Sequence, residues 1–293
     1  MKNYLLLGFI TLAQCLTPIF AKISVVEISP ISLGFLRFGC ASILFYITLK
    51  IRNGNLKFDR KDYPMLILLG ILCIPVNQFF FLTGIKLSRA SHSGIIYSLN
   101  PVFAYIIAIT RKNEKFYLSK LIAIFLTVIG IFFVFFDNIS KTNPDMKVIG
   151  GDILLIIAVF SFSLYLTLGK NLIDKHGALK VSTFAFLAGS ILYIPFFLAD
   201  MHNLSFADLS YKGIIGYLYL TIIVSFLAYF VWYYILKTIE VSKVTTFSNI
   251  SPLLTVIFSV IFLSEHLTIY LIFGGILTVI GVITMHKITL ELA

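Results

Sequence analysis

The sequence predicts an all-α integral membrane protein with ten transmembrane helices, arranged as two inverted five-helix repeats. Three observations support this fold: an apolar composition, a division into blocks of membrane-spanning length, and a repeat at a fixed offset. Of the 293 residues, 59% are hydrophobic and only 12% are charged, and the mean hydropathy is +0.99. A soluble domain with so little charge could not cover its surface.

The apolar residues fall into ten blocks. Each block approaches the roughly 20 residues that a helix needs to cross the hydrocarbon core. Helices are the expected form because each one satisfies its own backbone in lipid. The first block is interpreted as a retained helix, since further spans follow it. The predicted spans are residues 3–22, 30–51, 63–85, 91–110, 118–137, 151–170, 180–199, 213–236, 244–264 and 268–286.

The distribution of lysine and arginine predicts the orientation. With the N-terminus in the cytoplasm, the inner side carries 16 Lys and Arg residues and the outer side carries 6. This excess follows the positive-inside rule. The sequence therefore predicts a multi-pass protein of the cell (inner) membrane with both termini in the cytoplasm.

An offset of 151 residues (277 − 126) relates the two halves of the chain. Leu-Thr-Val-Ile-Gly occurs at residues 126–130 and again at 277–281. The same offset matches Ser91 with Ser242, Pro101 with Pro252, and Glu114 with Glu265. Because each half holds an odd number of spans, the second half enters the membrane from the opposite side. We expect repeats over residues 1–140 and 150–293, with Gly130 and Gly281 allowing close helix packing.

The composition argues against several functional classes. The net charge of +10 lies in short loops, without the basic run that would predict nucleic-acid binding. Three cysteines in apolar segments (Cys15, Cys40 and Cys73) predict neither a disulfide framework nor a zinc site. The five histidines are scattered, and no nucleophile motif or Gly-rich phosphate loop occurs. We therefore expect no enzyme activity, no cofactor and no metal.

The order of small residue, proline and glutamate in the fourth and ninth spans resembles a known family. The matching residues are Ser91, Pro101, Glu114 and Gly130, then Ser242, Pro252, Glu265, Gly274 and Gly281, together with Arg37 after Pro30. In this pattern the chain resembles the EamA type of the drug/metabolite transporter superfamily, over essentially its whole length. The resemblance implies a transporter but leaves the substrate open, because similar proteins export amino acids, take up choline, or move nucleotides and sugar phosphates.

Polar side chains in the fourth and ninth spans are candidates for the substrate site. Buried polar groups in a span are costly, so they mark cavities or helix contacts. Ser93, Tyr97 and Asn100 lie within about 60° of one another on a helical wheel. The ninth span carries a similar stripe, formed by Ser248, Ser251 and Thr255, with Asn249 beside it. Pro101 and Pro252 are expected to bend these two helices and to free a carbonyl.

Other spans add five candidates for substrate binding. They are Gln14 in the first span, Gln78 in the third, Tyr165 in the sixth, and Tyr229 and Trp232 in the eighth. The alternative for each is contact with a neighbouring helix, and for Trp232 it is anchoring at the membrane interface. If the tyrosines and Trp232 converge, they would suit a cationic or aromatic substrate.

Two ionisable residues are candidates for gating or ion coupling. Arg37 is the only full charge well inside a span, and it keeps its proton. It could bind an anion or act in gating, or it could pair with Glu27, Asp152 or helix carbonyls. His92, near the outer start of the fourth span, can titrate near neutrality, or it is an interfacial polar residue. Gln14 stands where related small multidrug carriers place a glutamate, which weakens a drug/proton antiport hypothesis.

Three hypotheses follow. The favoured one is a secondary transporter, a monomer or homodimer in the lipid bilayer, that moves a small polar metabolite by alternating access. An amino acid or related compound is the favoured substrate, and export is the favoured direction. A carrier of choline, another organic cation or drugs is the second, and it predicts that the tyrosines and Trp232 converge without a basic residue among them. A non-transport integral membrane protein is the third.

Overall fold

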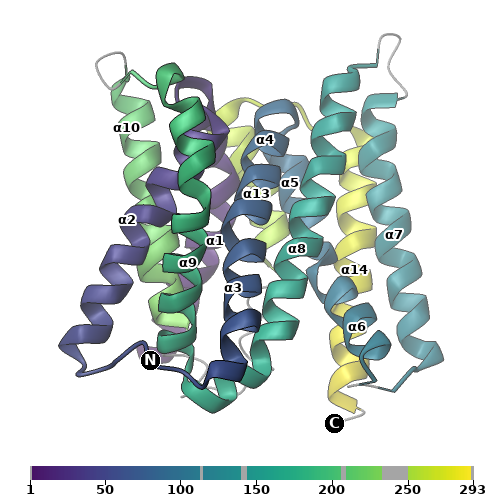
Figure 1. Ribbon diagram of the computed structural model, residues 1–293. Coiled ribbons are helices and arrows are strands. Elements are labelled where there is room, and N and C mark those ends of the chain that lie inside the picture. The colour runs from purple at the N-terminus through teal and green to yellow at the C-terminus, as the bar shows by residue number, and fades with distance from the viewer. Residues whose placement is uncertain (1, 113–114, 140–143, 206–208, 233–249, 292–293) are drawn as a thin grey trace.

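The protein is a bundle of long helices (Figure 1). The computed structural model describes residues 2–112, 115–139, 144–205, 209–232 and 250–291. Within these residues, nine helical segments are long and apolar enough to cross a membrane, and Ser251–Leu263 forms a shorter apolar helix. These ten segments, with no strand among the described residues, confirm the predicted all-α membrane fold.

The first half of the chain forms five spans. The third and fourth spans are interrupted: a π-helical segment divides the third, and a 3₁₀ turn divides the fourth. The elements are α1 (Lys2–Glu27), α2 (Pro30–Ile51), η1 (Arg60–Asp62), α3 (Tyr63–Ile71), the π-helical η2 (Leu72–Val76), α4 (Asn77–Leu87), α5 (Ala90–Ile96), the 3₁₀ turn η3 (Tyr97–Leu99), α6 (Asn100–Thr110) and α7 (Leu118–Ile139).

The second half repeats this order, and its eighth span also contains a π-helical segment. The elements are α8 (Met146–His176), α9 (Ala178–Asp200), η4 (Met201–Asn203), α10 (Tyr211–Leu218), the π-helical η5 (Tyr219–Ala228), α13 (Ser251–Leu263) and α14 (Ile269–Glu291). The sixth span is longer than the predicted 151–170, because Asp145 caps α8 through the Lys147 amide and Gly177, with φ 83°, ends it.

The two chain ends lie at the same end of the bundle (Figure 1). We call this the terminal end, and we call the opposite end the distal end. At the distal end, α1 continues to Glu27, beyond the predicted boundary at residue 22. Ser29 and Pro30 then start α2 at once: the Ser29 side chain accepts a hydrogen bond from the Ser32 amide, and Pro30 occupies the first turn.

The repeated Leu-Thr-Val-Ile-Gly segments face each other across the contact between α7 and α14. A Cβ at Gly130 would lie 2.7 Å from Thr278 N, and a Cβ at Gly281 would lie 2.8 Å from Thr127 N. These two contacts exchange under the 151-residue offset. Residues early in α7 contact residues late in α14, so the two helices run antiparallel. The predicted close packing at both glycines is confirmed.

Three helices at the distal end are capped by carboxylates from other spans. Asp200, at the end of α9, accepts from the Ser32 amide of α2 at 3.2 Å. Glu265, after α13, accepts from the Ala90 and Ser91 amides of α5 at 2.7 and 3.0 Å. Glu27, at the end of α1, accepts from the Ser210 amide before α10 at 2.8 Å. Each carboxylate satisfies unpaired amides and complements the helix dipole, and together they tie the distal ends to one another.

Candidate functional site

Arg37 projects from α2 into the bundle and is 3% exposed. Its Nε donates to Ser225 Oγ at 2.5 Å, and its Nη1 donates to Gln78 Oε1 at 3.3 Å. Among the described residues, no carboxylate lies within 4 Å of the guanidinium. The expected pairing with Glu27 or Asp152 is wrong, because both carboxylates are engaged at the distal end. Arg37 is therefore a buried cation held by neutral groups.

The two partners of Arg37 belong to the spans with π-helical segments. Ser225 lies within η5, and Gln78 follows η2 by two residues. Shifted by 151, residues 72–76 become 223–227, inside η5, so the wide turns occupy equivalent places in the two halves. Pro75 accounts for the turn in η2 because it has no amide hydrogen to donate. Segments of this kind frequently occur at functional sites.

A buried pair of amides extends the polar contacts away from Arg37. Gln78 Nε2 donates to Asn77 Oδ1 at 2.6 Å, and Asn77 Nδ2 donates to the Ala158 carbonyl of α8 at 2.8 Å. These bonds fix the orientation of the Gln78 carbonyl toward the guanidinium. The two adjacent amides thus have different partners: Gln78 bonds to Arg37, and Asn77 bonds to the neighbouring helix α8.

Aromatic side chains are among the neighbours of the guanidinium. The Arg37 Cζ lies 5.0 Å from the centre of the Phe38 ring, and Tyr97 and Tyr229 are close enough to interact with it electrostatically. Tyr229 packs edge-on against Phe186, with ring centres 5.3 Å apart. We call Arg37, Gln78, Tyr97, Ser225 and Tyr229 the Arg37 site. It combines a fixed positive charge, an amide, hydroxyls and aromatic faces, which can bind an anionic group attached to an organic body.

The remaining predicted residues in the described part of the chain lie elsewhere. Asn100 Oδ1 accepts from Ser163 Oγ at 2.6 Å, and the Tyr165 hydroxyl shares a hydrogen bond with Ser182, so both join helices. Gln14 is exposed, and Trp232 packs near the first turns of α1.

The expected helix bends involve two prolines, and two of the predicted substrate-binding residues belong to the same pair of spans. Pro101 follows the η3 turn by two residues, and Pro252 occupies the first turn of α13. Ser248 and Asn249 lie outside the described residues.

His92 is fully buried rather than interfacial, contrary to one expectation. Its Nδ1 lies 2.9 Å from Asp152 Oδ2, and its Nε2 lies 3.4 Å from Asp137 Oδ2. Arg89 pairs with the same Asp137 oxygen at 3.0 Å. We call Arg89, His92, Asp137 and Asp152 the His92 cluster. It joins α5, α7 and α8 near the distal end, away from the Arg37 site.

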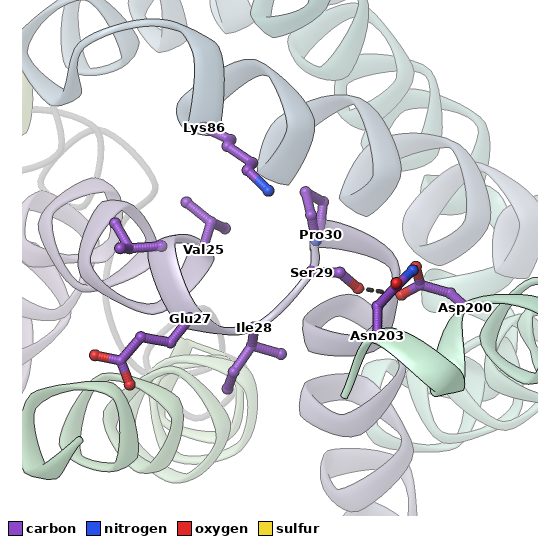
Figure 2. Close-up of a pocket in the computed structure, with 9 residues that line it drawn as sticks. Val25, Glu27, Ile28, Ser29, Pro30, Lys86, Asp200 and Asn203 are labelled. Carbon is purple, nitrogen blue, oxygen red and sulfur yellow. Dashed lines mark hydrogen bonds between the residues drawn. The ribbon is translucent and has the colours of Figure 1, made fainter. Parts of the chain in front are cut away.

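An open pocket of about 380 Å³ lies at the distal end between α1, α2, α4 and α9 (Figure 2). Lys86 points into it, while Asp200 turns aside to the Ser29 hydroxyl (Figure 2). The other carboxylate of the pocket, Glu27, bonds to Ser210. Both acidic groups thus serve as helix caps. The pocket therefore lies on the outer face of the distal end, where the capped helices meet.

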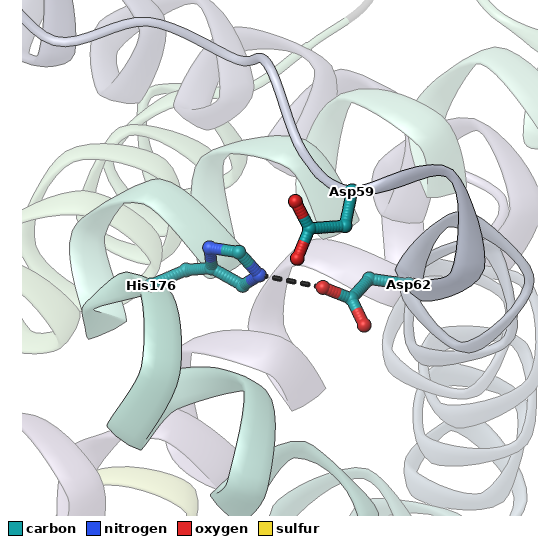
Figure 3. A group of neighbouring side chains, drawn as sticks. All are labelled: Asp59, Asp62 and His176. Carbon is teal, nitrogen blue, oxygen red and sulfur yellow. Dashed lines mark hydrogen bonds and ion pairs between the residues drawn. The ribbon is translucent and has the colours of Figure 1, made fainter.

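Asp59, Asp62 and His176 gather at the terminal end (Figure 3). His176 Nε2 lies 2.7 Å from Asp62 Oδ2, and Lys175 Nζ bonds to both carboxylates. The hydrogen bond and charge of Lys175 lower the pKa of the exposed Asp59 carboxyl. The ammonium occupies the position where a cation would neutralise the two carboxylates, so this group does not fit a metal ion while Lys175 is there.

A model of the EamA-like transporter family matches residues 2–136 and 149–286. The chain belongs to the EamA-like transporter family. It is therefore a multi-pass membrane transporter, as its resemblance to the drug/metabolite transporter superfamily predicts.

Similar proteins share this description. An uncharacterized transporter of Archaeoglobus fulgidus (strain ATCC 49558 / DSM 4304 / JCM 9628 / NBRC 100126 / VC-16) is 29% identical over 287 residues, covering 96% of each chain. The uncharacterized transporter YyaM of Bacillus subtilis (strain 168) is 27% identical, covering 90% of this chain and 87% of its own. A solved structure described only as a protein crystal structure has a TM-score of 0.69 at 16% identity, covering 99% of this chain and 98% of that one. This last likeness concerns the fold alone.

Sequence reasoning did not identify the partners within these sites. The sequence places Ser225 on one face of the eighth span with Tyr229 and Trp232, and the structure adds its hydrogen bond to Arg37. Asp137 and Asp152 lie 45 and 60 residues from His92 (137 − 92 and 152 − 92). One signal in the sequence points to them: carboxylates inside the ends of apolar spans need partners, and His92, a candidate for ion coupling, lies near the outer end of its span.

Proposed function

We propose that this EamA-like transporter moves a small polar metabolite, an amino acid or a related compound, by alternating access. The observation that carries the proposal is Arg37, a buried cation without a carboxylate partner among the described residues. A buried charge is costly unless it is paired. A substrate carboxylate would complete this pairing through charge-assisted hydrogen bonds, and Gln78 and the two tyrosine hydroxyls would bind the remaining polar groups.

The same residue weighs against an organic cation as substrate. That hypothesis required the tyrosines to converge without a basic residue among them, yet Tyr97 and Tyr229 are near a guanidinium. At low dielectric, two cations at such a site repel each other strongly. A substrate with both an ammonium and a carboxylate avoids the problem if its carboxylate faces Arg37.

The proposed orientation places the distal end outside the cell and both termini in the cytoplasm of the inner membrane, in agreement with the lysine and arginine count. The carboxylate caps then close the outer side, and the conformation is one of the two that alternating access requires. The reciprocal contacts of α7 and α14 support an inverted repeat, which lets the halves exchange conformations around a central site. Export is proposed from the family resemblance, and the transporter is proposed to act as a monomer or homodimer.

The test is counterflow in proteoliposomes with a panel of labelled amino acids, each compared with the amine that lacks its carboxylate. We expect transport of one or more amino acids and no competition by the matching amine. Arg37→Gln should reduce transport by about tenfold or more, since a loss of about 1.4 kcal/mol of binding is tenfold. Arg60→Gln, at the exposed terminal end, is the control and should transport normally. Equal competition by amine and amino acid would refute the role of Arg37.

A further inference from the structure

The distal start of α5 gathers six charged or titratable side chains from five parts of the fold. They are Lys22 on α1, Arg89 and His92 at α5, Asp137 on α7, Asp152 on α8, and Glu265 after α13. Lys22 Nζ donates to the Ile85 and Lys86 carbonyls at 2.8 and 3.0 Å, at the end of α4. The group therefore connects most of the helices that meet at the distal end.

The charge of this group depends on one proton. Lys22 and Arg89 contribute two positive charges, and the three carboxylates contribute three negative charges. A neutral His92 leaves an excess of one negative charge, whereas a protonated His92 balances the sum at zero. Both carboxylates of the His92 cluster are fully buried, and an unbalanced charge in such a place is costly.

The imidazole is placed to take up that proton between two carboxylates. Neutral histidine has a single N–H, so it can donate to only one of two facing carboxylates. Nδ1 is within hydrogen-bond distance of Asp152. Nε2 faces Asp137 at 3.4 Å and has no well-formed hydrogen bond. Asp137 and Asp152 also accept from the hydroxyls of Thr268 and Ser88, so His92 is not needed merely to satisfy them.

We propose that His92 is a proton-binding site of this carrier: a proton on its imidazole holds the distal ends of α5, α7 and α8 together, and release of that proton lets them separate. The proposal rests on the proposed function only in taking separation of the distal ends as a step of alternating access. The closed arrangement offers two acceptors to the imidazolium and an open one offers fewer. The closed state therefore binds the proton more tightly, and acid shifts the population toward closure.

Labelling of a single cysteine tests this without any substrate. Ala90 is fully buried at the distal start of α5, and its amide bond to Glu265 survives substitution by cysteine. In a chain whose three cysteines are replaced by alanine, Ala90→Cys is labelled with a membrane-impermeant maleimide. Tyr211→Cys, at a distal position that is 79% exposed, supplies the reference rate, because thiol reactivity itself rises with pH.

The expected result is a ratio of Ala90→Cys to Tyr211→Cys labelling that rises at least about threefold between pH of about 5.5 and 8.5, a range that spans the ordinary titration of histidine. His92→Gln should abolish this rise, whereas His202→Gln, at an exposed distal histidine, should preserve it. If His92→Gln does not fold, His92→Gln with Asp152→Asn restores a zero sum and should give a flat ratio.

Two results would overturn the proposal: a ratio independent of pH in the unmodified background, or a rise that persists without His92. If none of the labelled amino acids is transported in proteoliposomes, the proposed substrate class is refuted. That outcome would not affect the labelling result. The two proposals therefore fail separately.

Discussion

The backbone of Gly281 lies directly against that of Thr127, so that a Cβ at position 281 would be 2.8 Å from the Thr127 amide nitrogen. A second close atom is the Ala123 carbonyl oxygen, also 2.8 Å from that Cβ. Real Cβ atoms do not approach backbone so closely, and backbone in a packed helix has little room to yield. The contact between α7 and α14 thus depends on the absence of a side chain at this position.

Replacement of Gly281 by alanine should destabilise the protein. Alanine is intrinsically better than glycine in a helix by about 0.8–1.0 kcal/mol, but overpacking of a tight contact costs about 1–3 kcal/mol, so the second effect prevails. Thermal unfolding in detergent should show a lower Tm. Gly8→Ala is the matched control, because a Cβ at position 8 meets nothing within 4 Å. It should leave the Tm unchanged or raise it, and an unchanged Tm for Gly281→Ala would contradict the expected clash.

Glu265→Ala should weaken the start of α5. The substitution removes both acceptors of the Ala90 and Ser91 amides, and the loss of a helix cap costs about 0.5–2 kcal/mol. Hydrogen exchange at residues 90–96 should accelerate, and the Tm should fall. Glu265→Gln keeps one acceptor oxygen and should fall between alanine and the unmodified protein. His266→Ala, at the adjacent exposed residue, should change neither measurement; a comparable effect there would mean that the loop and not the cap matters.

Lys175→Met should create a binding site for a divalent metal at the terminal end. It removes the ammonium from between Asp59 and Asp62 and leaves a histidine and two carboxylates, which are donors that Zn²⁺ accepts. Added Zn²⁺ should raise the Tm of this variant and leave that of the unmodified protein unchanged. The added substitution His176→Gln should remove the effect. Stabilisation of the unmodified protein by Zn²⁺ would show that Lys175 does not exclude the ion.

The fold followed from the sequence because its determinants are periodic or repeated. Apolar blocks of membrane-spanning length predict helices whatever their neighbours, and the offset linking residues 126–130 to 277–281 pairs the two halves without any knowledge of contacts. The sequence did not indicate that these two copies touch each other, because a repeat gives equivalence and not proximity. The predicted boundaries of α1 and α8 are also too short, since polar residues such as Glu27 and Asp174 lie within the helices.

The candidate sites were less accessible to sequence reasoning. Arg37, Gln78, Tyr97 and Tyr229 stood out because polar groups are rare in apolar spans, and the structure brings these four together. Asn100 and Tyr165 stood out for the same reason, yet they bond to neighbouring helices. Composition cannot separate these roles, because they depend on which way each helix is turned. The π-helical segments change which residues of α4 and of the end of the eighth span face the bundle. In the sequence, only Pro75 indicates such a segment.

The seam between α7 and α14 has the geometry of a symmetric dimer interface contained in a single chain. Gly130 meets Thr278 as Gly281 meets Thr127, and the carbonyls of Gly274 and Ala123 complete the exchange. Contacts that are reciprocal in this way are isologous: one surface supplies both sides. The two halves therefore present equivalent residues to each other at this contact, as two subunits of a symmetric dimer do. Unlike the identical subunits of a homodimer, the two covalently linked halves can differ in sequence. Arg37 is an example, since the equivalent position in the second half, 188 (37 + 151), holds an alanine.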